Sequence, residues 1–147
     1  GLEALARSKA PDAIEWLAGS RGVAPTAVAA IGNDINDVAM LERAALWLRL
    51  KGYRILARRL KTHAGEIDLV AAAPFGPVCF VEVKARKEAR IAADSVGPAQ
   101  QTRIAHAARL YLASRPGLAR RGSRFDIIAI APGAFPVHHR DVWRPEF

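Results

Sequence analysis

The feature that most constrains this chain is a pair of short apolar runs in which charged residues occupy every second position. They lie in residues 64–85, AGEIDLVAAAPFGPVCFVEVKA, and a Pro-Phe-Gly-Pro turn separates them. Because side chains of a strand alternate between its two faces, Glu66 and Asp68 are expected on one face of a hairpin, as are Glu82 and Lys84. Carboxylates set side by side repel one another and are costly to bury. This hairpin is therefore the first candidate for a functional site.

Asp68, Glu82 and Lys84 together have the composition of a site for phosphodiester hydrolysis. Carboxylates on neighbouring strands can hold one or two magnesium ions, and a lysine beside them would orient the attacking water or stabilise charge on the phosphate. The same residues also fit cross-strand salt bridges on an exposed sheet face, with Glu66 or Glu82 paired to Lys84. The spacing alone leaves both interpretations open.

The distribution of charge favours a polyanionic partner. The chain has a net charge of +8, but residues 1–44 carry four basic and six acidic side chains, whereas the other 103 residues carry 18 basic and 8 acidic ones. An excess of +10 on that second part points to nucleic acid first, with an anionic membrane surface or a merely solvated exterior as competitors.

The remaining apolar patterns predict one α/β domain. After a short helix from Pro11 and an apolar strand following Pro25, they predict helices over 36–51 and 98–114 and strands over 53–60, 66–73, 78–85 and 124–131. The last strand is almost wholly apolar, which is typical of the interior of a sheet. Asp37 is expected to cap the first of these two helices. The tail predicts no defined element, and His138 and His139 are expected at the surface.

The sequence contains no apolar run of membrane-spanning length and no secretory signal, so we expect a cytoplasmic protein with no membrane partner. Cys79, the one cysteine, lies in an apolar strand, and we assign it no role.

Lys9, the helix after it and the segment VAAIGNDINDVAML resemble the last third of a haloacid dehalogenase-superfamily phosphatase. In that family such a loop helps to hold magnesium, which would involve Asp34 and Asp37. The nucleophile of that family is an aspartate of an earlier D-x-D motif, and nothing upstream of Lys9 supplies it. We interpret residues 1–44 as a haloacid-dehalogenase-like fragment rather than an independent domain. A magnesium-dependent phosphatase-type hydrolase stays as the second alternative function.

Five segments of residues 45–147 occur in a characteristic order: AALWLRLKGYRILARR, AGEIDLVA, VCFVEVKAR, a helix containing Gln101, and RFDIIAI. In these segments, residues 45–147 resemble the YraN-like (UPF0102) family of predicted endonucleases, which is distantly similar to archaeal Holliday-junction resolvases. The resemblance implies a nuclease-like domain with a restriction-endonuclease-like, PD-(D/E)XK fold, in which helices flank a mixed central sheet and an N-terminal helix-strand-helix segment precedes it.

The resemblance also implies roles for individual residues. Asp68 and Glu82 would be ligands of Mg²⁺ or Mn²⁺, and Lys84 would be the catalytic lysine. Glu66 would be a supporting carboxylate, and Gln101 would face the site from its helix. The implied activity is metal-dependent cleavage of structured or branched DNA, commonly by a homodimer.

Basic residues near the hairpin are candidates for contacts to the DNA backbone, with a solvated face as the alternative. They are Arg58, Arg59, Arg86, Lys87 and Arg90.

Two positions depart from the family pattern. Its first helix usually carries a Gly-Glu pair, but the matching positions here are Met40 and Leu41, and Glu42 is out of register by about 100° of helix rotation. The helix after Pro98 has Gln100 where a lysine is usual. These departures keep one alternative open, a nucleic-acid-binding module with the nuclease fold and an incomplete active site.

Overall fold

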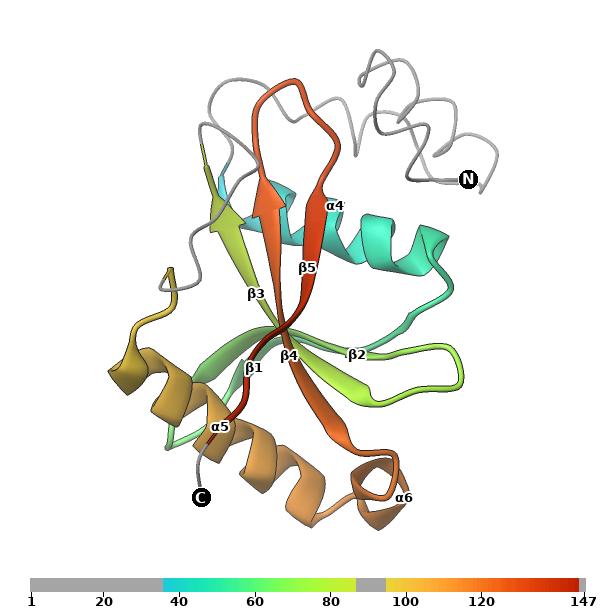
Figure 1. Ribbon diagram of the computed structural model, residues 1–147, viewed down its shortest axis with the longest axis vertical. Coiled ribbons are helices and arrows are strands. Elements are labelled where there is room, and N and C mark those ends of the chain that lie inside the picture. Colours follow the sequence, from blue (N-terminus) through green and yellow to red (C-terminus); the bar gives the residue numbers. More distant parts are fainter. Residues whose placement is uncertain (1–35, 87–94, 146–147) are drawn as a thin grey trace.

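The computed structural model describes residues 36–86 and 95–145, which form a five-stranded sheet with a long helix on each face (Figure 1). The predicted N-terminal helix and strand, and Asp34 with them, lie outside the described residues. A mixed α/β fold with a flanked central sheet is confirmed. The elements are α4 Asp37–Leu50, β1 Arg54–Lys61, β2 Glu66–Ala72, β3 Val78–Ala85, α5 Pro98–Ala113, α6 Pro116–Ala119, β4 Ser123–Ile130 and β5 Val137–Trp143.

The strands follow one another across the sheet in the order β1-β2-β3-β4-β5. All neighbours are antiparallel except β3 and β4, which run parallel. A parallel pair needs a crossover connection, and α5 lies in the one between β3 and β4. β4 is therefore an interior strand, as its apolar sequence predicted.

The tail contradicts the sequence expectation, because its residues 137–143 form the edge strand β5. Its sequence, VHHRDVW, lacks the regular apolar alternation of a half-buried strand, so no pattern indicated it. Pairing with β4 supplies the backbone hydrogen bonds that hold it extended.

Two apolar cores hold the helices against the sheet. On one face Leu48 of α4 packs with Val81 of β3, and on the other Ile104 of α5 packs with Phe80 of β3. Since Phe80 and Val81 are consecutive, β3 alternates between the two cores. Glu82 follows the parity of Phe80 and lies on the α5 side of the sheet.

The N-terminus of α4 differs in one detail from the prediction. The side-chain oxygen of Asn36 accepts a hydrogen bond of 2.8 Å from the backbone N–H of Ala39, so Asn36, not Asp37, is the N-cap. Asp37 occupies the first turn, where a carboxylate interacts favourably with the helix dipole. Among the helices of residues 36–86 and 95–145, none combines the length and apolar character needed to span a membrane.

Candidate active site

The acidic hairpin contains a break in the sheet at Asp68. The pairing of β2 with β3 runs from Ala72 and Val78 to Leu69 and Val81 and ends there. Beyond it the Asp68 carboxylate accepts a hydrogen bond of 2.8 Å from the backbone N–H of Val83. The carboxylate thus takes the place that a strand carbonyl would occupy in a continuous ladder. Asp68 therefore lies at the point where the pairing of β2 with β3 ends.

This break also changes which faces the residues of β2 occupy. Ile67 belongs to the core under α5, whereas Leu69 belongs to the core under α4, so strict alternation fails on either side of Asp68. The prediction that Glu66 and Asp68 share a face assumed that alternation, and it stays a prediction. Glu66 is exposed at the first position of β2, opposite Lys61 of β1.

Glu82 lies between a lysine and an amide. Its Oε1 atom is 3.3 Å from Nζ of Lys84 and accepts a hydrogen bond of 3.0 Å from Nε2 of Gln100 on α5. An ion pair of the kind expected from the salt-bridge interpretation is present. However, the Glu82 side chain is only 12% exposed, so the pair does not lie on an open sheet face. Two neighbouring carboxylates are held here in a half-buried site with one lysine.

Burial makes both carboxylates harder to ionise. It is the largest cause that raises the pKa of Asp68, against the hydrogen bonds with Val83 and Glu82 and the charge of Lys84, which lower it. Burial likewise raises the pKa of Glu82, and the negative charge of Asp68 raises it further. Lys84 is the one cation that an ion pair joins to these carboxylates among the described residues. Carboxylate oxygens are the ligands that Mg²⁺ prefers in proteins, and this ion keeps several of its waters.

Helix α4 brings Asp37 toward the site, whereas the family pattern led us to expect a glutamate at the position of Leu41. Leu41, at the position of the expected glutamate, is buried in the core, and Glu42 forms an ion pair of 3.0 Å with Arg58. The negative charge of Asp37 is close enough to contribute to the raised pKa of Asp68. Asp37 precedes Leu41 by four residues and so lies on the same side of α4, one turn earlier. That i, i+4 relation is the signal in the sequence that could have identified it.

Gly65, just before β2, packs closely against α5. A side chain at Gly65 would place Cβ 3.1 Å from the backbone oxygen of Arg103, so a larger residue would require α5 to shift by a few tenths of an ångström. The helix then presents Gln100 to Glu82. Gln101, the residue expected to face the site, instead donates a hydrogen bond of 2.8 Å to the carbonyl of Val96.

The basic residues predicted to contact DNA are distributed around this region. Arg58 and Arg59 are exposed on β1, and Arg86, which is half-buried, donates a hydrogen bond to the carbonyl of Ala85. Lys87 and Arg90 lie outside the described residues. Within the part of the chain that the structure describes, no group of three or more His, Cys, Asp or Glu residues is placed to hold a metal ion.

A second polar cluster lies inside the sheet. Asp126 of β4 is completely buried and accepts hydrogen bonds from Arg124, from Nε2 of His138 and from the backbone N–H of Asp141. Arg124 also donates a 2.7 Å hydrogen bond to the hydroxyl of Tyr53. The expectation that His138 lies at the surface is wrong, since its side chain is 1% exposed. This cluster ties β5 to β4 and to the end of α4.

Comparison with known proteins gives one consistent result. The uncharacterised protein family UPF0102 matches residues 42–130. A UPF0102 protein of Paramagnetospirillum magneticum is 51% identical over 105 residues, which cover 69% of this chain and 81% of that protein. A UPF0102 protein of Parvibaculum lavamentivorans is 50% identical over 102 residues, 69% of this chain and 76% of its own length. A third, from Rhodopseudomonas palustris strain BisB18, is 46% identical over 133 residues and covers 90% of this chain and 89% of its own.

Proposed function

The chain belongs to the uncharacterised protein family UPF0102, and we propose that it is a metal-dependent endonuclease that hydrolyses phosphodiester bonds in structured or branched DNA. We further propose that its mixed sheet is a restriction-endonuclease-like, PD-(D/E)XK fold, with Mg²⁺ or Mn²⁺ as the cofactor. Neither the family description nor the names of the relatives state a reaction.

One observation carries the proposal: Asp68 and Glu82 meet in a half-buried site in which, among the described residues, Lys84 is the one cation that an ion pair joins to them. Burial is the largest cause of both raised pKa values, and the charge of Asp68 raises the pKa of Glu82 further, whereas a hydrogen bond with Glu82 lowers the pKa of Asp68. A purely structural pair would be expected to find compensating partners, because uncompensated buried charge destabilises a fold. A divalent cation would supply the missing charge.

Asp68, Glu82 and the residues around them would each have a separate role in the hydrolysis. A bound divalent cation would supply Lewis acidity and charge neutralisation for the hydrolysis. Asp68 and Glu82 would hold it, and the hydrogen bonds from Val83 and Gln100 fix the orientation of these two carboxylates. The ammonium group of Lys84, 3.3 Å from Glu82, would stabilise the charge that develops on the phosphate as water adds to phosphorus and a P–O ester bond breaks.

The charge of the surrounding chain supports DNA as the substrate. Residues 45–147 carry an excess of ten positive charges, and Arg58 and Arg59 are exposed on the strand beside β2. Such an excess attracts the phosphate backbone irrespective of base sequence. Cleavage of both strands of a branched substrate would require two sites, so we propose that the active form is a homodimer, which sedimentation of the free protein would test.

A nucleic-acid-binding module without catalysis is the second candidate, and the buried Leu41 favours it. The position at which the family pattern places a glutamate carries an apolar side chain that is 6% exposed, so the site lacks that carboxylate. The substitute from α4, Asp37, lies one turn earlier.

Cleavage assays on linear, flapped and four-way-junction DNA, with Mg²⁺, Mn²⁺ or chelator, would separate these functions. Under the proposal, the parent cuts in a metal-dependent way, and Glu82→Gln and Lys84→Met each lower the rate by at least about 100-fold. Matched controls carry the same substitutions at exposed positions, Glu42→Gln on α4 and Lys61→Met on β1. These controls should cut at rates within a few-fold of the parent.

The outcomes assign the function. If neither metal gives cleavage while the parent and both site variants bind DNA equally, the protein is the binding module. Binding itself has a separate check in a salt titration, where affinity should fall with a slope of about −0.9 per phosphate contact. An affinity that does not change with salt would remove nucleic acid as the ligand of either candidate.

A further inference from the structure

The turn between β2 and β3 carries the most exposed of the large apolar side chains that the structure describes. Phe75 has a relative exposure of 109%, whereas Val38, the next in exposure, has 57%. In Figure 1 this turn lies at the margin of the molecule. Single exposed apolar side chains are common on protein surfaces, so the exposure of Phe75 acquires a meaning only together with its backbone and its surroundings.

The backbone of Phe75 is strained. Its φ is 53°, in the left-handed region that glycine and asparagine favour and that an aromatic residue seldom adopts. The chain therefore keeps a residue whose backbone conformation costs stability and whose side chain gains none through burial. Residues held in such conformations are concentrated at functional sites.

Hydrogen bonds hold this turn in one conformation. The backbone N–H of Ala73 donates to the carbonyl of Pro77 at 3.0 Å, and that of Gly76 donates to the carbonyl of Ala73 at 3.2 Å. Arg121, which follows α6, donates from Nε to the carbonyl of Gly76 at 2.9 Å and from Nη2 to the carbonyl of Ala73 at 2.6 Å. Phe75 is thus carried on a rigid backbone, which reduces the conformational entropy lost when the residue binds a partner.

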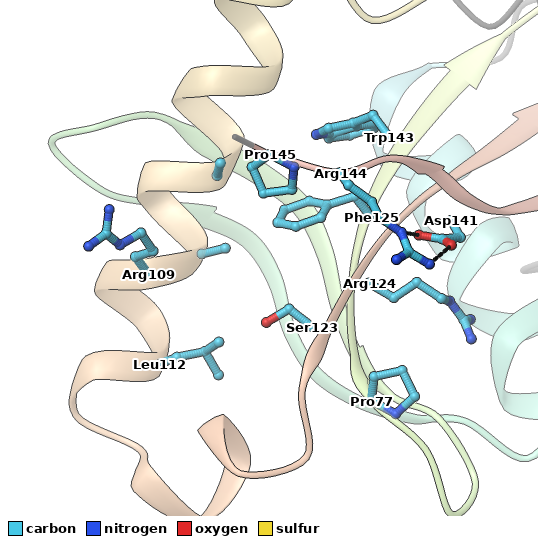
Figure 2. A pocket seen from close by; sticks show the side chains of 12 residues that line it. Pro77, Arg109, Leu112, Ser123, Arg124, Phe125, Asp141, Trp143, Arg144 and Pro145 are labelled. Carbon is cyan, nitrogen blue, oxygen red and sulfur yellow. Dashed lines mark hydrogen bonds and ion pairs between the residues drawn. The ribbon is translucent and has the colours of Figure 1, made fainter. Parts of the chain in front are cut away.

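The base of the turn is joined to the start of β4. The backbone N–H of Val78 donates a hydrogen bond of 2.9 Å to the carbonyl of Gly122. Figure 2 shows Pro77 and Ser123, which both line a cavity of about 450 Å³ between α5 and the end of the sheet formed by β4 and β5. The turn is therefore anchored to β4 as well as to its own two strands.

The surroundings of Phe75 are basic. Phe75 lines an open hollow of about 570 Å³, and among the described residues that line it the charged ones are Arg54 of β1 and Arg121, both exposed. A second copy of this chain is a poor partner, because a symmetric contact around Phe75 would bring the arginines of both copies together. Nucleic acid is complementary to this surface, since it combines anionic phosphates with flat bases that stack on aromatic rings.

We infer that Phe75 is a wedge that stacks on a base where the helical stack of DNA is interrupted, as at a flap, a gap or the centre of a junction. The inference rests on the proposed function only for the choice of DNA as the ligand. Insertion into an intact duplex requires that a base step be unstacked first, whereas an interrupted stack is already open. Phe75 would therefore select branched or interrupted DNA over linear duplex.

The wedge lies at the opposite end of β2 from the carboxylate pair. Ala73, at the start of the turn, is five residues beyond Asp68, which corresponds to about 17 Å of extended chain. At 3.4 Å for each base pair, the open step would lie about five base pairs from the phosphodiester bond at the carboxylates.

Binding to two duplexes of the same length and sequence, one intact and one with a one-nucleotide gap at its centre, tests this inference. Fluorescence anisotropy in chelator reads binding without cleavage. The parent should bind the gapped duplex at least about fivefold more tightly, the lower end of what stacking of one base on an aromatic side chain contributes. Phe75→Ala removes the ring and should abolish the preference, with affinity for the intact duplex within about twofold of the parent. Phe75→Tyr keeps a ring and should keep the preference.

Leu110→Ala is the matched control, because Leu110 of α5 is also an exposed apolar side chain, at 39%, but does not line the hollow beside Phe75. It should keep the preference, and melting temperatures would identify any variant that fails to fold. The inference is overturned if the parent shows no preference, if Phe75→Ala retains it in full or if Phe75→Tyr loses it.

Two further outcomes separate the wedge from other roles. If Phe75→Ala changes the sedimentation of the free protein and leaves DNA binding unchanged, the ring belongs to a contact between copies of the chain and the inference is overturned. If Phe75→Ala loses the preference but neither Mg²⁺ nor Mn²⁺ gives cleavage by the parent, the wedge stands and the nuclease proposal fails. Metal-dependent cleavage by a parent that binds both duplexes equally has the opposite meaning.

Discussion

Replacing Asp126 by asparagine should destabilise the fold severely although the shape of the side chain hardly changes. The carboxylate is completely buried and accepts hydrogen bonds from Arg124, His138 and the backbone of Asp141. Asparagine removes the charge and turns two N–H groups toward these donors. Breaking a buried ion pair by removing one partner costs about 3–5 kcal/mol. That cost is a large part of the 5–15 kcal/mol by which domains are typically stable.

The pH dependence of the unfolding free energy gives a second, independent measure of how much Asp126 stabilises the fold. Burial alone would raise the pKa of Asp126, but the hydrogen bonds from His138, Arg124 and Asp141 outweigh it and lower the pKa to about 2. A carboxyl whose pKa is lower in the folded state stabilises the fold above its unfolded pKa, near 4, and loses this contribution as the pH falls toward 2. The shift corresponds to about 2 kcal/mol. The parent should lose that amount between pH 4 and pH 2, and Asp126→Asn should not.

Urea unfolding followed by circular dichroism at pH 7, 4 and 2 measures both effects. Asp141→Asn is the control, since its carboxylate pairs with an Arg144 side chain that is 83% exposed, and asparagine tolerates the φ of 54° at this position. Surface pairs of this kind contribute about 0–1 kcal/mol. Equal losses for the two variants at pH 7, or an unchanged acid dependence in Asp126→Asn, would refute the assignment of this cluster as a main stabilising element.

Three further predictions each concern the replacement of one residue. Gly65→Ala would bring a methyl group within 3.1 Å of the Arg103 backbone and should cost about 1–3 kcal/mol in the same unfolding assay, whereas an unchanged stability would mean that α5 moves freely. Phe75, which is fully exposed with a φ of 53°, should gain up to about 1 kcal/mol of unfolding free energy when replaced by asparagine, and a loss would contradict this reading of its strain. Gln100→Leu removes the hydrogen bond that orients Glu82 and should lower metal-dependent cleavage by about 10-fold at unchanged DNA affinity, so equal rates would exclude a positioning role.

The sequence identified the elements that carry strong patterns. β3 was predicted at the bounds observed, and α5 and β4 within one residue, because apolar periodicity and proline punctuation define them locally. β5 was missed, since its strand conformation depends on pairing with β4 and its own residues do not alternate. His138 was misplaced for the same reason. A histidine in a tail is indistinguishable from a buried one until its partner on another strand, Asp126, is known.

Part of the candidate site could be predicted from the sequence, because that part also depends on local spacing. Asp68, Glu82 and Lys84 lie on adjacent strands of one hairpin, so their proximity follows from local spacing alone. Contributions from the helices depend on rotation about the helix axis, in which one residue is about 100°. That is why Gln100 rather than Gln101 reaches Glu82. The activity, the metal, the DNA partner and the division at residue 44 stay predictions.

The order of the strands also has a consequence for how the molecule folds. β1, β2 and β3 are consecutive in both chain and sheet, so Asp68 and Glu82 are brought together by short-range contacts. The parallel pairing of β3 with β4 requires closure of the long crossover from Ala85 to Ser123, which costs more loop entropy and is slower. We expect the two carboxylates to come together in the early, local part of folding, before β4 and β5 extend the sheet beyond β3. A divalent cation that binds them would then accelerate folding as well as stabilise the folded state.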